Sequence, residues 1–144
     1  MLLALVVWIG GIIFFAFVLA PTSFHVLIPE LAGRVVGRSI SILHGMGIVS
    51  GLVFLVCSVV YHRAKYARLN ALALANVLVV IMLALTCISQ FRITPEMEAV
   101  RPGIHVSLQA QTEFDRLHHW SERLEGGVLF LGLAVIGLTA RRFS

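Results

Sequence analysis

The residues best suited to chemistry are histidines that lie in or beside apolar segments. His44 sits inside one such segment, and His118 directly precedes another. Two neutral imidazoles on neighbouring helices can ligate a b-type haem from opposite sides, so His44 and His118 form a candidate haem-binding pair. Heights counted along the helices place His118 roughly 8 Å above His44, which weighs against a shared iron. Haem binding is therefore an alternative hypothesis.

A copper or other soft-metal site is a second cofactor hypothesis. Its candidate ligands are His44, His118 and His119, with His25, Met46 and Met97 as further donors, because imidazole and thioether groups suit copper. The sequence has no dense Met-x-x-Met or His-x-His array, and four methionines are ordinary packing residues in a membrane bundle. The cofactor thus stays unassigned, with haem and copper possible but not favoured.

Neither an enzyme nor a nucleic-acid-binding protein is indicated. The chain contains no GxSxG, HExxH or phosphate-loop motif. Its net charge of +4 comes from basic residues in short segments between apolar runs, where orientation signals of membrane proteins are expected. We predict a non-catalytic protein with no nucleic-acid partner.

A structural role is the favoured interpretation of His44. It is predicted to belong to a polar ring with Ser121, Glu125 and Arg92, and to donate or accept a hydrogen bond with Glu125 or Ser121. Such interhelical contacts are worth about 0.6 kcal/mol on average and fix helix register. Arg92, just above the ring, is predicted to neutralise Glu125.

The elements that position these residues are four apolar helices. The chain is 59% hydrophobic with 12% charged residues, and its mean hydropathy is +0.97, which is too apolar for a water-soluble domain of 144 residues. Runs at about 2–21, 40–61, 71–90 and 121–140 each supply the ~20 residues that cross ~30 Å of hydrocarbon. We predict an all-α, integral membrane four-helix bundle forming a single domain, 1–144.

Charge distribution predicts the orientation of this bundle. The link 62–68 carries three Lys/Arg and no acid, and the chain ends in Arg141-Arg142 and two further residues, so both termini are predicted to be cytoplasmic in a cell membrane. The segments 22–39 and 90–120 then face outward. In the latter, spans three and four are predicted to continue as a helical hairpin around the breaker Pro102-Gly103, with Pro95 kinking its first arm.

Small residues predict where the helices approach one another. Gly47 and Gly51 form a small-xxx-small pair on the polar face of span two, and Gly10 and Gly11 lie beside a tryptophan in span one. At ~1.5 Å per residue from the cytoplasmic ends, His44 falls level with 122–125 on span four and 89–90 on span three. The polar ring is therefore predicted near the outer membrane face.

Two sets of residues give the sequence a family resemblance. The opening contains Trp8-Ile9-Gly10-Gly11-x-x-Phe14-Phe15, then Ala20-Pro21-x-x-Phe24 and Ala32-Gly33. The far half has Pro95, Arg101 and Phe114-x-x-Leu117-His118-x-x-Ser121. Together they resemble the transmembrane-protein-205-like family of four-span proteins, and distantly the copper-resistance D-like proteins. Glu125 departs from the Asn that this family often has after Ser-x-x-Leu.

These observations favour a non-catalytic, multi-pass accessory or scaffold subunit of a larger membrane complex, for example an electron-transfer or photosynthetic assembly. Its expected partners are the lipid bilayer and other membrane protein subunits, which would contact its span faces and the hairpin. The alternative is the haem- or copper-binding protein that uses His44 and His118.

Overall fold

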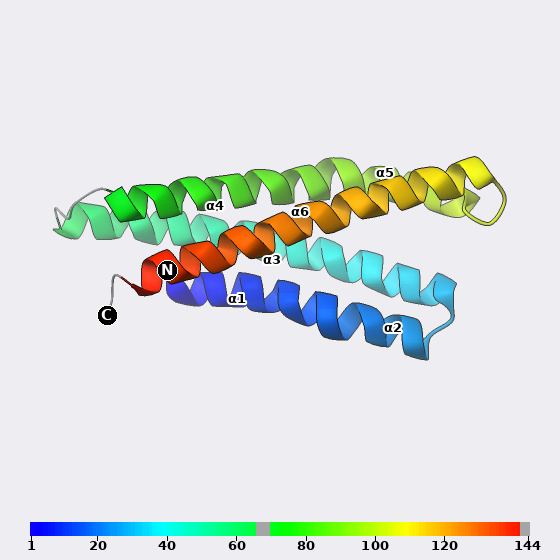
Figure 1. Ribbon diagram of the computed structural model, residues 1–144, viewed down its shortest axis with the longest axis horizontal. Helices are drawn as coiled ribbons and strands as arrows, with labels where there is room; N and C mark the ends of the chain where they lie inside the picture. Colours follow the sequence, from blue (N-terminus) through cyan, green and yellow to red (C-terminus); the bar gives the residue numbers. More distant parts are fainter. Residues whose placement is uncertain (66–69, 142–144) are drawn as a thin grey trace.

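The protein folds into long helices that run side by side along one axis (Figure 1). The computed structural model describes residues 1–65 and 70–141. The first helical segment comprises α1 (Leu2–Phe14), the π turn η1 (Phe15–Leu19) and α2 (Ala20–Val26). It is followed by α3 (Pro29–Lys65), then by α4 (Asn70–Ile88), the π turn η2 (Ser89–Ile93), α5 (Thr94–Val100) and the 3-10 turn η3 (Arg101–Gly103), and finally by α6 (Leu108–Ala140).

Four of these helical segments are long and apolar enough to cross a membrane. They span Leu2–Val26, Pro29–Tyr61, Ala73–Gly103 and Leu108–Ala140. The predicted all-α membrane bundle is therefore confirmed as the fold class, and the chain is a multi-pass transmembrane helical protein. The beginning of α1 and the end of α6 lie at the same end of the bundle, which we call the terminal end, and the opposite end is the hairpin end (Figure 1).

Each helical segment continues well beyond the apolar run that predicted it. Residues 22–39, predicted as an outer segment, are almost entirely helical: α2 ends at Val26 and α3 begins at Pro29. Pro29 suits the first position of a helix because its missing N–H needs no partner there. The predicted hairpin around Pro102 and Gly103 is present, with α5 and α6 as its arms, and it projects furthest at the hairpin end (Figure 1).

Two π turns occur next to prolines that lie within helices. η1 ends two residues before Pro21, and η2 ends two residues before Pro95. A proline has no N–H to donate and its ring clashes with the carbonyl four residues earlier, so the preceding turn must widen. The prolines therefore interrupt the regular hydrogen bonding but leave both helices continuous.

The core is built where glycines admit large side chains from other helices. A Cβ on Gly47 would collide with the Trp8 indole, and a Cβ on Gly51 would lie 2.6 Å from Leu83 and 2.9 Å from Trp8. As a result Trp8, from α1, is fully buried against α3, the helix that carries both glycines. The predicted packing positions thus include real close contacts on α3.

The two glycines of α1 differ from each other. A Cβ on Gly11 would lie 3.0 Å from Leu43 and 3.3 Å from Met46, so it is a close-contact position. Gly10 has nothing within 4 Å of its Cβ position and is exposed, so its predicted role in packing within the bundle is wrong. Part of the basic link 62–68 and Arg142 lie outside the described residues.

Candidate functional site

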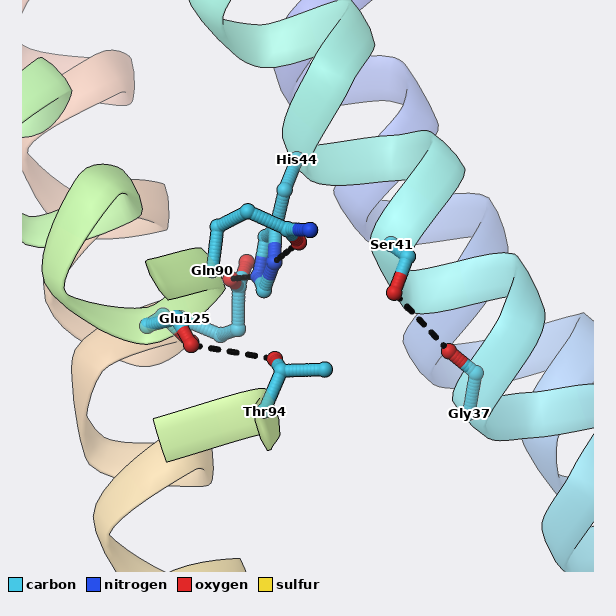
Figure 2. A network of polar contacts seen from close by, with 7 residues as sticks. Gly37, Ser41, His44, Gln90, Thr94 and Glu125 are labelled. Atoms are coloured by element: carbon cyan, nitrogen blue, oxygen red, sulfur yellow. Dashed lines mark hydrogen bonds and ion pairs between the residues drawn. The ribbon is translucent and has the colours of Figure 1, made fainter. Parts of the chain in front are cut away.

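His44 is the centre of a buried polar contact among three helical segments. Its side chain is 1% exposed. The Nδ1 atom lies 2.8 Å from Oε1 of Gln90, and Nε2 lies 2.5 Å from Oε1 of Glu125. Figure 2 shows the ring held between these two side chains, which come from η2 and α6. The contact therefore ties α3 to both arms of the hairpin at their base.

Hydrogen-bonding chemistry restricts where the hydrogens of this contact can lie. Because Oε1 of Gln90 can only accept, Nδ1 of His44 carries a hydrogen and donates it. One further proton lies between Nε2 and Glu125, where it forms either an imidazolium–carboxylate pair or a neutral imidazole with a carboxylic acid. Both arrangements leave the pair with no net charge, which is how two ionisable groups are accommodated inside a membrane bundle.

The π turn η2 places Gln90 in this contact. It opens the helix before Pro95, and Thr94 Oγ1 donates to the carbonyl of Ser89 at 3.0 Å. The hydroxyl thereby satisfies a carbonyl beside the widened turn. Thr94 lies next to the polar contact in Figure 2. The π turn before Pro95 and the His44 contact therefore lie side by side in the structure.

A groove of about 570 Å³ adjoins the polar contact at the hairpin end. Its walls come from the α1–η1–α2 segment, α3, α5 and α6. Figure 1 shows α2 and α6 separating toward this end, with α3 between them. The first wall is apolar, with Phe15, Phe17 and Phe24, whereas α6 contributes polar groups that include Glu125. Glu125 therefore faces both His44 and the groove.

Arg101 closes the groove at the hairpin end. Its guanidinium donates to both carboxylate oxygens of Glu98, at 2.8 and 3.2 Å, and lies 5.5 Å from the centroid of the Phe114 ring. A Cβ on Gly33 or Gly37 would lie 2.9 Å from the guanidinium nitrogens. These glycines of α3 therefore allow the arginine of the hairpin to lie against the α3 backbone.

Comparison with known proteins identifies the family. The family described as "Domain of unknown function (DUF4149)" matches residues 3–105, which is more than half of the chain. The chain belongs to this DUF4149 family. No curated protein and no solved structure matches it. The matched region includes α1 to α5 and the residues His44 and Gln90, so the DUF4149 match covers two of the three members of the polar contact.

The histidines proposed as haem or metal ligands in this DUF4149 protein have other partners. Both ring nitrogens of His44 are occupied by Gln90 and Glu125. His118 Nε2 lies 3.2 Å from Glu122, and His119 Nδ1 lies 3.2 Å from the same carboxylate. Within residues 1–65 and 70–141, no three His, Cys, Asp or Glu side chains are grouped so that they could hold a metal ion. Ligation by His44 would require breaking one of its two hydrogen bonds.

The polar ring differs from its prediction at Arg92. Arg92 is exposed and lies 3.7 Å from Glu96, one turn along its own helix, so its predicted role in neutralising Glu125 is wrong. His44 is the partner of Glu125 instead. Ser121 is buried and lines the groove. The error arose because a height count gives the level of Arg92 but not its direction around the helix.

Sequence reasoning found the level of Gln90 but not its role, and it gave Arg101 no part in a site. The signal for Gln90 was Pro95, five residues later, whose effect on the preceding turn rotates the side chains there. The signal for Arg101 was the pair Gly33 and Gly37 at helical spacing of four, which opens one face of α3.

Proposed function

We propose that this multi-pass membrane protein is a non-catalytic accessory subunit of a larger complex in the cell membrane, with its termini in the cytoplasm. The observation that carries the proposal is the exposure of large apolar side chains at the tips of the hairpin end. Val106 and Leu108 are 86% and 80% exposed in the α5–α6 hairpin. Val26 and Ile28, beside the α2–α3 link, are 76% and 68% exposed.

These tips lie outside the hydrocarbon if the lipid covers the predicted spans. Leu108 precedes the start of span four, near Ser121, by roughly 20 Å of helix, and the α2–α3 link lies roughly 16 Å above the start of span two. Apolar residues that face lipid need no further cover, but those at the tips face water. Apolar patches exposed to water mark interaction surfaces, and a partner subunit with an apolar outer surface would cover both tips.

Extraction in a gentle detergent followed by native mass measurement tests this proposal. We expect the protein to run with other subunits in a particle of fixed stoichiometry. Val106→Asp combined with Leu108→Asp should release it, because charges would enter the apolar contact. Gln109→Asp, a polar position in the same hairpin, is the matched control and should stay in the complex. A monomer alone, or a particle unaffected by the paired substitution, contradicts the proposal.

We also infer that the relationship extends to the transmembrane-protein-205-like proteins. The residues that carry this resemblance occupy defined places in the structure: Trp8 fills the space above Gly47, and Phe114 stacks on His118 with the ring planes 6° apart. Phe114, His118 and Ser121 lie beyond residues 3–105, so the matched region does not test them. A family alignment with these residues in common columns supports the inference, and their absence would refute it.

A further inference from the structure

We propose that the groove between α2 and α6 binds one membrane phospholipid with a primary ammonium headgroup, of the phosphatidylethanolamine class. Its acyl chain would lie on the apolar wall of α1–η1–α2, and its headgroup would lie against His118 and Glu122 of α6. The site is separate from the hairpin tips that the proposed function requires.

The size and walls of the groove suit an acyl chain. Its volume of about 570 Å³ lies within the range of roughly 300–1,000 Å³ that small-molecule sites have. Phe15, Phe17 and Phe24 line one side, and Leu129 lies at the α6 side. Gly126, also in the lining, has nothing within 4 Å of its Cβ position, so the space beside it is unfilled by the chain.

The height of the polar wall matches that of lipid headgroups. His118 and Glu122 flank Ser121, where span four is predicted to enter the hydrocarbon. Both side chains line the groove and are about half exposed, so a ligand can reach them. A lipid that enters between α2 and α6 would therefore place its headgroup beside these two residues without leaving its normal depth in the bilayer.

The charges of the lining favour an ammonium group over a net anionic headgroup. Of the three carboxylates in the lining, Glu98 pairs with Arg101 and Glu125 pairs with His44. This leaves Glu122, which is half exposed and contacted by histidine side chains, as the carboxylate that can receive a cation. His118 Nε2 already contacts Glu122 at 3.2 Å, and the carboxylate keeps further lone pairs that can accept from an ammonium. A primary ammonium has three N–H donors for that carboxylate, whereas the quaternary ammonium of phosphatidylcholine has none.

Lipid binding by the full-length protein tests the proposal. Delipidated protein in micelles would be titrated with dioleoyl phosphatidylethanolamine, phosphatidylcholine or phosphatidylglycerol, and bound lipid counted by native mass spectrometry. We expect one phosphatidylethanolamine per chain, held about tenfold more tightly than either other lipid, as the loss of a charge-assisted hydrogen bond implies. Equal binding of the three lipids, or preference for phosphatidylglycerol, overturns the proposal.

Two pairs of variants locate the lipid. Gly126→Leu should fill the groove and abolish retention, whereas Gly137→Leu, on the same helix with nothing within 4 Å of its Cβ and outside the groove, should retain it. Glu122→Gln should remove the preference among headgroups, whereas Glu113→Gln, which pairs with Arg116 away from the groove, should keep it. Retention by Gly126→Leu, or an unchanged preference in Glu122→Gln, places the lipid elsewhere and refutes the site.

Discussion

At the scale of single residues, the contact between His44 and Glu125 allows two ionisable side chains to lie inside the bundle. Interhelical hydrogen bonds in membranes are worth about 0.6 kcal/mol on average, with a maximum near 1.7. His44 is almost wholly buried and pairs with an ionisable partner, so we expect a value at the upper end of this range. The contact is thus large enough to set helix register, while the core packing supplies most of the stability.

A double-mutant cycle tests this assignment. Glu125→Leu alone should destabilise the bundle by about 1–2 kcal/mol, because Nε2 of His44 loses its partner in a buried place. Combining it with His44→Phe should recover part of that loss, since both ionisable groups are then gone and Gln90 is the polar member of the contact left without its partner. Reversible unfolding in mixed micelles measures the free energy of unfolding of each single variant and of the double variant. If the double variant is as unstable as the sum of the single ones, the two side chains do not interact.

At the scale of helices, the glycines separate into packed and open positions, and substitutions at the two kinds should have opposite signs. Gly47→Ala places a methyl group against the Trp8 indole and should cost about 1–3 kcal/mol through overpacking. Gly10→Ala meets nothing and should stabilise α1 by up to about 1 kcal/mol, from helix propensity. Thermal unfolding in one detergent compares them, and equal effects would contradict the packing.

These glycines also show what a sequence can predict about helix packing. Gly47 and Gly51 share a face with His44, so their inward direction followed from helical periodicity. Gly10 and Gly11 are adjacent and point about 100° apart, so both cannot face the same neighbour, and the side that α3 occupies depends on the assembled bundle. The hairpin was predictable because Pro102-Gly103 breaks the helix in the sequence itself. The groove was not, because it forms between segments distant along the chain.

At the scale of the whole molecule, the predicted orientation of the bundle in the membrane can be tested directly by cysteine labelling. The basic residues near the α3–α4 link predict that the terminal end is cytoplasmic and the hairpin end external. In a chain with Cys57→Ala and Cys87→Ala, a cysteine introduced by Gln109→Cys should react with a membrane-impermeant maleimide in intact cells. One introduced by Arg63→Cys should react only after permeabilisation. The reverse pattern would invert the topology.

Levels counted from the rise per residue were the most accurate part of the whole-molecule prediction. The count placed residues 89–90 and 122–125 level with His44, and the structure joins Gln90 and Glu125 to that histidine. Rise per residue is nearly constant in a helix, so levels can be counted from a sequence. Direction around the axis is less secure, because each π turn shifts it, and Arg92, which lies inside η2, is where the prediction failed.

The two widened turns have a consequence for the evolution of the chain. A π turn holds one residue more than the α turn it replaces, so it is the natural place for a one-residue insertion in an ancestral straight helix. Relatives that lack the surplus residue within 15–19 or 89–93 would keep the same spans but rotate everything beyond by about 100°. The length of 89–93 therefore decides how the hairpin arm beyond it is turned relative to α4, and the length of 15–19 does the same for α2 relative to α1.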